Sequence, residues 1–333
     1  MPDANRRYLR PSSFCLLNPL LVIGLSSTLI GCEAALDLEA VTQQAQHSHQ
    51  RTDFYQAMAS NPQVTVLVGN EGVVVSSPDN GGHWQRQQLP TDMSLIDLAV
   101  CPDQSCIALS FDNRIWHADP KAQNWTPHAL PSAEQMMATA CAPDGSWWVA
   151  GAFSTLQSSA DGGQSWVEVS LDEDAIFTTL QFVAPRQAVV SGEYGLRFIS
   201  QDGGESWEPS GNLPDEFYPH ASYYSSLEKG WVGGLNGFIW HTNDAGETWQ
   251  RQPTDTQAPI FGFIEGPEGL YAVGENATVL QLNGQRWSSL QTPDQPLYLR
   301  AGRLLPNQHL LAAGGRGLLL NIPLPKALAA STD

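Results

Sequence analysis

The chain has 333 residues, with 34 acidic side chains against 16 basic ones and a net charge of −18. An acidic excess of this size repels phosphate groups, so it argues against a partner made of nucleic acid or anionic lipid head groups. The 29 glycines, 23 prolines and 11 tryptophans indicate an all-β protein, since no long amphipathic helical pattern follows residue 50.

Residues 1–31 have the features of a lipoprotein signal peptide. Arg6, Arg7 and Arg10 form a basic start, and an apolar stretch from Phe14 to Ile30 follows. The stretch ends in Leu29-Ile30-Gly31-Cys32, which resembles a bacterial lipobox. We therefore expect cleavage before Cys32 and lipidation of its thiol, with firm anchoring by several acyl chains. The alternatives are an ordinary cleaved signal with a chance cysteine, or an uncleaved helix.

A lipidated and exported chain would face the periplasm from a membrane of the cell envelope. Cleavage would leave 13 basic and 33 acidic residues, for a net charge of −20. Glu33 follows the cysteine, whereas an aspartate there often retains enterobacterial lipoproteins in the inner membrane. The outer membrane is therefore slightly favoured.

The segment 32–50 is polar and is predicted to be a tether, followed by one folded domain over 51–325 and a tail over 326–333. His47 and His49 make a poor metal site, because no third ligand lies near them in the sequence. A cluster of carboxylates at 172–174 is an equally weak calcium signal, since it has no glycine turn. We expect no metal and no cofactor.

Three cysteines remain for the folded domain. Cys101 and Cys106 flank Pro102-Asp103-Gln104-Ser105, a tight-turn sequence between two predicted strands. In an oxidising compartment this pair is expected to form a disulfide, and the alternative is two buried free thiols. Cys141 has no evident mate and is expected to be a core residue.

An internal repeat dominates the sequence. One marker is an aromatic anchor, with gaps of 41, 41, 41, 42 and 38 residues between its copies, Trp84, Trp125, Trp166, Trp207, Trp249 and Trp287. A second marker gives the same frame, with gaps of 41, 41, 41, 42, 40 and 40, at Gly69, Ser110, Gly151, Gly192, Gly234, Gly274 and Gly314. Seven units therefore cover the chain from residue 54 to about residue 322.

Four of the units carry the motif S/T-x-D-x-G-x-x-W, known as an Asp box. Its aspartate and tryptophan pairs are Asp79 and Trp84, Asp161 and Trp166, Asp202 and Trp207, and Asp244 and Trp249. The carboxylate can accept hydrogen bonds from its own turn, and the glycine supplies a positive φ. The tryptophan is expected to pack against the next unit. We interpret the motif as a structural clamp and not as a catalytic site.

Each unit is expected to form four short strands. In the third unit these are residues 136–142, 147–151 and 155–159 and a strand from Trp166. Four-stranded units of about forty residues predict a seven-bladed β-propeller. The seventh unit shows three strands, so a segment before Phe54 is expected to supply a closing strand.

Two known families share the Asp box. Sialidases and related glycoside hydrolases also need an arginine triad and a Tyr-Glu pair, and no equivalent is evident here. The second resemblance is closer. The pattern V-G-x-x-G followed by S-x-D-G-G-x-x-W is similar to the photosystem II stability/assembly-factor propellers and their non-photosynthetic bacterial relatives. It stands here at 68–72 with 79–84, at 192–195 with 202–207, and at 234–237 with 244–249.

The second resemblance implies a seven-bladed, non-catalytic propeller that binds a membrane-protein precursor and assists its assembly. Its photosynthetic members are thought to use an arginine-rich patch, and this sequence shows no equivalent.

Alternating strand directions place the turns between the second and third strands on the same face as the loops between blades. We call this the rim face; its candidate binding residues are Glu71, Phe111, Asp112, Phe153, Glu193, Tyr194, Asn236, Glu275 and Arg316. The inter-blade loops add nine further acids. Acidic groups interleaved with aromatics suit a basic or amphipathic polypeptide. The alternative is that these acids only keep the protein soluble.

The sequence therefore favours a monomeric, non-enzymatic, lipid-anchored propeller that binds a protein partner and assists the assembly or stability of a membrane protein complex. The alternatives are a glycoside hydrolase of the sialidase type and a carbohydrate-binding module of the cell envelope.

Overall fold

The computed structural model describes residues 38–267 and 269–324. The predicted signal peptide, Cys32 and the tail from residue 325 lie outside this range. The chain divides into two compact units after Thr42, and the β-structure lies entirely in the second. A short helix, α1 (Glu39–Ala45), spans the division. Within the described residues, no helix is long and apolar enough to cross a membrane.

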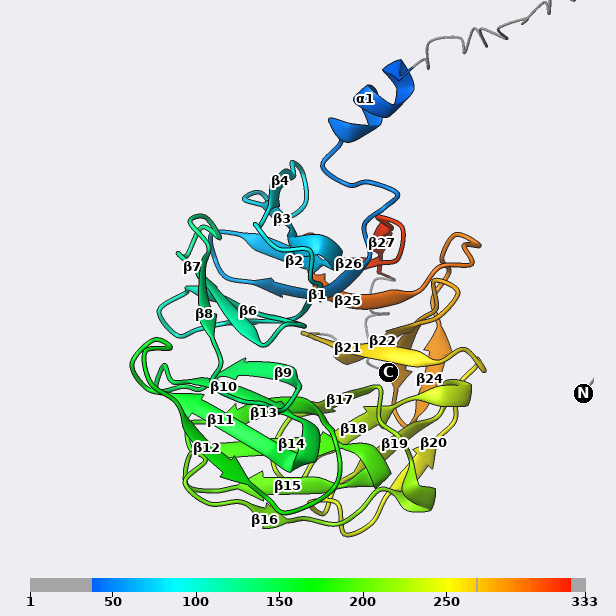
Figure 1. Ribbon diagram of the computed structural model, residues 1–333. Helices are drawn as coiled ribbons and strands as arrows, with labels where there is room; N and C mark the ends of the chain where they lie inside the picture. Colours follow the sequence, from blue (N-terminus) through cyan, green and yellow to red (C-terminus); the bar gives the residue numbers. More distant parts are fainter. Residues whose placement is uncertain (1–37, 268, 325–333) are drawn as a thin grey trace, which may run out of the picture. The chain divides into compact units, whose positions relative to one another are not determined.

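Seven antiparallel sheets follow one another along the chain, as the repeat predicted (Figure 1). The first three consist of β1 (Tyr55–Ser60), β2 (Thr65–Gly69), β3 (Val73–Ser77) and β4 (Gln85–Gln88); β5 (Leu95–Val100), β6 (Cys106–Ser110), β7 (Arg114–Ala118) and β8 (Thr126–Ala129); and β9 (Met136–Cys141), β10 (Trp147–Gly151), β11 (Thr155–Ser159) and β12 (Val167–Ser170).

The next two sheets consist of β13 (Phe177–Ala184), β14 (Gln187–Gly192), β15 (Arg197–Ser200) and β16 (Glu208–Pro209), and of β17 (Ala221–Tyr224), β18 (Gly230–Gly233), β19 (Ile239–Thr242) and β20 (Gln250–Gln252). The last two consist of β21 (Ile260–Gly266), β22 (Gly269–Gly274), β23 (Val279–Asn283) and β24 (Arg286–Ser289), and of β25 (Leu299–Leu304), β26 (His309–Gly314) and β27 (Leu319–Pro323). The seven-bladed β-propeller is confirmed, with three strands in its last blade.

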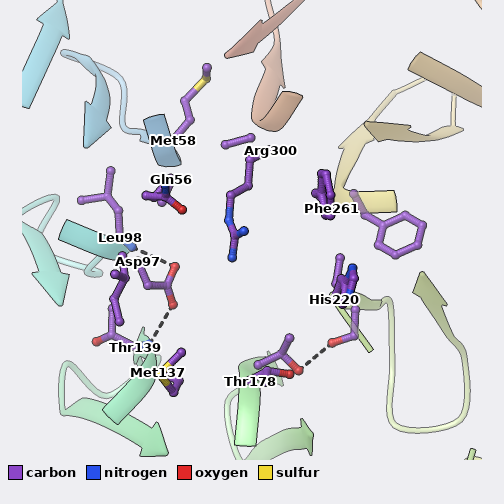
Figure 2. Close-up of a pocket in the computed structure, with 18 of the residues that line it drawn as sticks. Gln56, Met58, Asp97, Leu98, Met137, Thr139, Thr178, His220, Phe261 and Arg300 are labelled. Carbon is purple, nitrogen blue, oxygen red and sulfur yellow. Dashed lines mark hydrogen bonds between the residues drawn. The ribbon is translucent and has the colours of Figure 1, made fainter. Parts of the chain in front are cut away.

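The first strands of the seven blades surround the propeller axis. Residues from β1, β5, β9, β13, β17, β21 and β25 together line one cavity of about 340 Å³ (Figure 2). The second strands are almost fully buried, as in β2, β6 and β10. The fourth strands are largely exposed and form the outer edge. Such burial on both faces explains why the second strands are continuous apolar runs, while the outer strands are polar.

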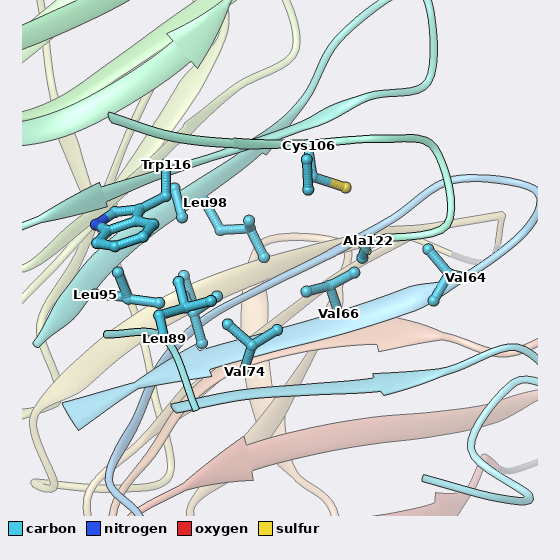
Figure 3. Close-up of a cluster of buried hydrophobic side chains, with 13 residues drawn as sticks. Val64, Val66, Val74, Leu89, Leu95, Leu98, Cys106, Trp116 and Ala122 are labelled. Carbon is cyan, nitrogen blue, oxygen red and sulfur yellow. The ribbon is translucent and has the colours of Figure 1, made fainter. Parts of the chain in front are cut away.

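Apolar side chains fill the space between each blade and the next, which gives seven core clusters for seven interfaces. In the first interface, Val66 and Val74 of blade one meet Leu98 and Trp116 of blade two (Figure 3). Trp116 is 1% exposed, and its indole N–H donates to the Ser110 hydroxyl at 3.2 Å. The core is therefore distributed around the ring and has no single centre.

The Asp-box tryptophans contact the preceding blade and not the next one, which corrects the expectation from the sequence. Trp207 of blade four lies against Trp148 of blade three, with ring centroids 6.1 Å apart. Trp287, the equivalent residue of blade six, which has no Asp box, likewise donates to the Gln252 side chain of blade five at 2.8 Å. Trp207 and Trp249 each pack against the apolar cluster that their own blade shares with the preceding one.

Ring closure also differs from the expectation. Within residues 38–53 no strand forms, and Phe54 makes only an isolated bridge to Gly315. Blade seven instead packs directly on blade one, with Ala313 in the same cluster as Tyr55 and Val75. Apolar packing between the blades therefore supplies the closure that we had expected from a fourth strand.

A buried ionic network fixes the residues just before blade one. The Asp53 carboxylate, 1% exposed, accepts two hydrogen bonds from Arg86 at 2.8 and 2.9 Å. The Tyr55 hydroxyl donates to the same carboxylate at 3.1 Å and lies 2.6 Å from Nδ1 of His49. Burial lowers the pKa of His49, so this ring is held neutral. His49 is therefore a packed residue of the propeller.

Candidate partner-binding face

The rim face is formed by a repeated turn between the second and third strands of each blade. In six blades the middle residue of this turn has a left-handed backbone, with φ between 50° and 57°, at Glu71, Phe153, Tyr194, Asn236, Asn276 and Arg316. The second blade places Asn113 in this conformation instead. A left-handed backbone turns the middle side chain outward, and all six side chains are exposed.

Each turn is fastened to the inter-blade loop beside it. The backbone N–H groups of Gly72, Ser154 and Ala277 donate to the carbonyls of Met93, Ala175 and Leu297 at 2.6–2.9 Å. In blade seven the N–H of Gly317 donates to the Asp53 carbonyl at 2.8 Å. The segment before blade one thus takes the position that the loop to the next blade has in the other blades. Gly317 has a φ of +69°, and a Cβ there would lie 2.4 Å from the Gln50 carbonyl oxygen. The rim is therefore a rigid platform of turns and loops.

Exposed apolar side chains gather on this platform. Of the large exposed apolar side chains described after residue 42, all but one lie on the rim face: Phe54, Met93, Phe111, Phe153, Tyr194, Tyr218 and Leu235. The exception is Val167 of β12. Phe153 and Tyr194 are 55% and 58% exposed. A concentration of exposed apolar groups on one face is typical of an interaction site.

The acidic groups of the rim have several different surroundings. Asp112 pairs with Arg114 at 3.2 Å, and Asp255 pairs with Arg286. Glu193 is half-buried and accepts the backbone N–H of Ile176 at 2.9 Å. The inter-blade acids Asp92, Asp172, Glu173, Asp174, Asp215 and Asp294 are exposed. The structure thus places the predicted rim residues on one face, with exposed negative charge between the apolar groups.

The opposite face carries the Asp boxes, whose carboxylates are used within their own turns. Asp161 accepts the Ser159 hydroxyl at 2.8 Å, the Ser165 backbone N–H at 2.9 Å and the Ser165 hydroxyl at 2.6 Å. The hydrogen bonds from Ser165 hold the pKa of Asp161 at about 2. The same bonding pattern lowers the pKa of Asp79, Asp202 and Asp244. A carboxylate held so firmly as an anion is unsuited to general-acid catalysis near neutral pH.

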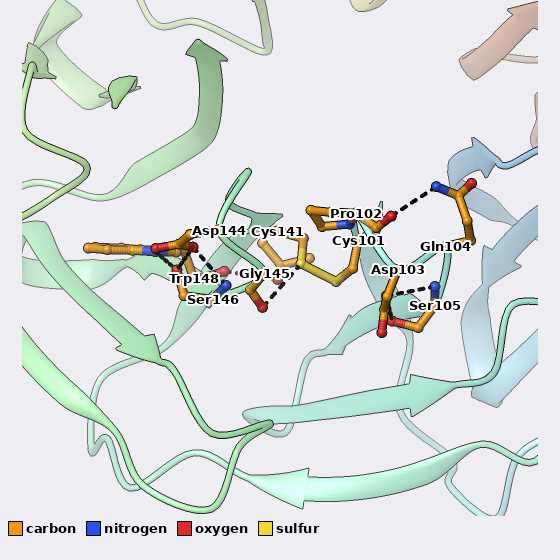
Figure 4. The surroundings of a disulfide bond; sticks show 11 residues. Cys101, Pro102, Asp103, Gln104, Ser105, Cys141, Asp144, Gly145, Ser146 and Trp148 are labelled. Carbon is orange, nitrogen blue, oxygen red and sulfur yellow. Dashed lines mark hydrogen bonds between the residues drawn. A yellow bond between two sulfur atoms is a disulfide. The ribbon is translucent and has the colours of Figure 1, made fainter. Parts of the chain in front are cut away.

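The disulfide of the propeller joins Cys101 to Cys141, with Cα atoms 5.0 Å apart, so the predicted pairing of Cys101 with Cys106 is wrong (Figure 4). Cys106 pairs with Val100 across the β5–β6 ladder, whereas the backbone N–H of Cys101 donates to the carbonyl of Ser105 at 2.9 Å. Neighbouring positions of a strand point to opposite sides. Cys106 therefore faces blade one as a buried free thiol, and Cys101 faces blade three.

The sequence did contain a signal for the correct pairing. Cys101 and Cys141 are 40 residues apart, one fewer than the 41-residue spacing of the repeat in these blades. Cys101 follows β5 directly and Cys141 ends β9, so both lie at the same end of the first strands of adjacent blades. The local turn sequence between Cys101 and Cys106 concealed this longer-range relation.

The axial channel contains functional groups that the sequence reasoning missed. Figure 2 shows Arg300 of β25 reaching toward the middle of the channel, between Asp97 on one side and His220 on the other. Asp97 accepts the backbone N–H groups of Thr139 and Leu98, each at 2.8 Å. Burial raises the pKa of Asp97 to about 6. The available signal was a charged side chain within an innermost strand: Asp97 is the one charge in β5, and β25 carries Arg300 and Arg303.

Sequence comparison relates the chain to one family. Residues 162–286 match the family model for the photosynthesis system II assembly factor YCF48. The photosystem II assembly lipoprotein Ycf48 of Synechococcus sp. (strain RCC307) is 24% identical over 239 residues, which is 70% of this chain. That of Synechococcus sp. (strain CC9605) is 31% identical over 220 residues, or 65% of this chain. The matches span 60% and 54% of the length of these relatives.

Solved structures share the fold at low sequence identity. YCF48 bound to a D1 peptide superposes with a TM-score of 0.67 over 82% of this chain and 93% of that chain, at 16% identity. Virginiamycin B lyase from Staphylococcus aureus superposes with a TM-score of 0.72 over 83% and 96% of the two chains, at 13% identity. Structural likeness at such identities shows the propeller fold alone. Together with the matching repeats, the sequence comparisons support the resemblance that the motifs indicated, to a family of Ycf48-like propellers.

Proposed function

We propose that this propeller is a non-catalytic binding protein whose rim face captures a protein partner and assists the assembly or stability of a membrane protein complex. The observation that carries the proposal is the pair of aromatic side chains Phe153 and Tyr194. Both are exposed to solvent and both stand on left-handed backbone. Each feature is unfavourable for an isolated protein, and such strain clusters at ligand-binding sites.

The chemistry of the rim indicates the chemistry of its partner. Exposed carboxylates at Asp92, Asp174 and Asp294 lie on the same face as the aromatic residues. Long-range attraction to these charges would accelerate association with a basic segment, and the aromatic side chains would supply most of the affinity. A basic, amphipathic extramembrane segment fits this face best.

The expected anchor at Cys32 would hold the protein at the membrane that carries such a segment. The relatives from Synechococcus are lipoproteins by name, and one solved relative is bound to a D1 peptide. Labelling with a radioactive fatty acid tests the anchor directly. We expect the label in the wild-type protein and none in Cys32→Ser. Persistent label in that variant would refute lipidation at this residue.

A pull-down from detergent-solubilised envelopes tests the rim. The test protein carries Phe111→Ala, Phe153→Ala and Tyr194→Ala. The matched control carries Gln164→Ala, Val167→Ala and Glu205→Ala, three exposed positions in or beside the Asp boxes. We expect the captured partner to fall about tenfold or more in the rim variant and to persist in the control. Identical partner lists would refute binding at the rim.

Turnover assays separate this function from the enzymatic alternative. The protein is incubated with sialosides and polysaccharide fragments, and released products are measured. We expect no product. Turnover that one carboxylate substitution abolishes would refute the non-catalytic proposal, and glycan binding without turnover would favour a carbohydrate-binding module.

A further inference from the structure

The axial channel holds one cationic side chain, Arg300, which is exposed to solvent and has no side-chain partner in the described structure. Arg300 has five N–H donors and makes no hydrogen bond or ion pair within the described part of the chain. Its neighbours around the cavity come from other blades, including Thr139 of β9 and Thr178 of β13. A guanidinium in such a position can bind an anionic oxygen acid in the forked geometry that a carboxylate matches.

The opposing acid in the channel does not satisfy Arg300. The two oxygens of Asp97 already accept the N–H groups of Thr139 and Leu98, and no ion pair joins Asp97 to Arg300. Burial also raises the pKa of this carboxyl, which reduces the negative charge that would repel an anion. Asp97 therefore has its hydrogen-bond donors, whereas Arg300 has no acceptor in the channel.

A second polar group in the channel is also without a partner. Nδ1 of His220 is buried and makes no hydrogen bond in the described structure. Its ring stacks on Phe261, with centroids 5.6 Å apart and planes 20° apart, which fixes its orientation. Burial lowers the pKa of His220, so the ring is neutral and one of its nitrogens can donate to a ligand.

The channel is large enough for a ligand and opens toward the rim. A connected cavity of about 300 Å³ shares Arg300, His220 and Phe261 and adds Tyr218 and Pro219 from an inter-blade loop of the rim face. Cavities of this size suit a small organic molecule or the end of a peptide. Tyr218 and Phe261 both lie against His220, so the entrance is aromatic while the interior is polar.

We propose that the axial channel binds a carboxylate, with Arg300 as the anion-binding residue, His220 as a neutral hydrogen-bonding partner and the aromatic entrance as a filter for size and shape. The carboxylate can belong to a free organic acid or to the C-terminus of a peptide. This site does not depend on partner binding at the rim, and either can exist without the other.

Isothermal titration calorimetry tests the site. It uses the mature chain, without the expected signal peptide. The probes are succinate, its uncharged diamide, an acetylated tripeptide with a free carboxyl end, and the same tripeptide amidated. We expect binding of at least one carboxylate probe and none of its uncharged counterpart. Binding of succinate alone assigns a free organic acid, and binding of the free tripeptide alone assigns a chain end.

Two substitutions that each remove one positive charge locate the site. Arg300→Gln is expected to weaken carboxylate binding about tenfold or more, because it removes a charge-assisted contact. Arg251→Gln removes the same charge from the outer strand β20, where Arg251 is exposed, and should change the affinity less than about twofold. Circular dichroism verifies that both variants fold. Equal affinity of wild type and Arg300→Gln, or no binding of any carboxylate probe, would overturn the proposal.

Discussion

The two faces of the propeller use the same residue types in opposite ways. On the Asp-box face, carboxylates such as Asp161 accept hydrogen bonds within their own turns, and tryptophans such as Trp207 pack into the interface with the preceding blade. On the rim face, acids such as Asp174 remain in solvent, and Phe153 and Tyr194 project outward. The difference indicates that one face stabilises the ring and the other is available to a partner.

The largest effect should come from Asp53, whose carboxylate is 1% exposed and whose carbonyl accepts the N–H of Gly317 in the rim turn of blade seven. Asp53→Asn leaves Arg86 without its anionic partner while keeping the size of the side chain. We expect the free energy of unfolding to fall by about 3 kcal/mol, because a buried charge becomes uncompensated. Urea unfolding followed by tryptophan fluorescence measures it.

A matched control makes that test specific. Asp112→Asn breaks the ion pair to Arg114, in which both side chains are partly exposed, and should lower stability by less than about 1 kcal/mol. Equal losses in the two variants would show that the Asp53 network does not secure the N-terminal segment.

The disulfide offers the second largest effect. Cys141→Ser opens a covalent link between blades two and three that closes a 40-residue segment. We expect a loss of about 2–4 kcal/mol, which reduction of the wild-type protein with dithiothreitol should reproduce. Cys106→Ala is the control, because it removes the free thiol and keeps the disulfide, so it should lose stability on reduction as wild type does. A stable Cys141→Ser protein that still loses stability on reduction would favour the pairing of Cys101 with Cys106.

Asp97 provides a pH-dependent comparison of the channel with the faces. Its pKa of about 6 exceeds the ordinary value of 3.8, so the folded protein binds this proton more tightly than the unfolded chain. Its contribution therefore favours folding at low pH and is lost as the pH rises from about 4 through 6. We expect wild type, relative to Asp97→Asn, to lose about 1–2 kcal/mol between pH 4.5 and pH 7.5.

Chemical unfolding at the two pH values measures this difference. Asp294→Asn, at an exposed acid of an inter-blade loop, is the control and should follow wild type. Parallel profiles for wild type and Asp97→Asn would contradict the raised pKa.

The sequence was most informative where the molecule repeats itself. The strands of blade three were predicted at 136–142, 147–151 and 155–159, and the structure places β9 at Met136–Cys141, β10 at Trp147–Gly151 and β11 at Thr155–Ser159. The spacing of the tryptophans and glycines carries this information, because each unit must bury the same faces as its neighbours.

The sequence was least informative for contacts between blades. The partner of Cys101, the direction in which the tryptophans pack and the mode of ring closure each depend on which neighbour a side chain faces. Local turn sequences do not contain that relation. Arg300 and Asp97 were missed for the same reason, since only the assembled ring brings β25 and β5 to one channel.

The smallest effect on stability should distinguish the two faces most clearly. Phe153→Gly places the residue that best tolerates a left-handed backbone at a φ of 50°. Stability should rise by about 0.5–1 kcal/mol, because the strain of a bulky residue in that conformation is relieved, while partner binding should fall. Asp161→Ala should do the reverse: it removes the acceptor of the Ser165 hydrogen bonds, lowers stability by about 1 kcal/mol and leaves binding unchanged. Thermal unfolding measures the stability of both variants, and the pull-down measures their partner binding. A Phe153→Gly protein that is less stable and still binds its partner would mean that the rim aromatics serve the fold, and the distinction between the two faces would then be lost.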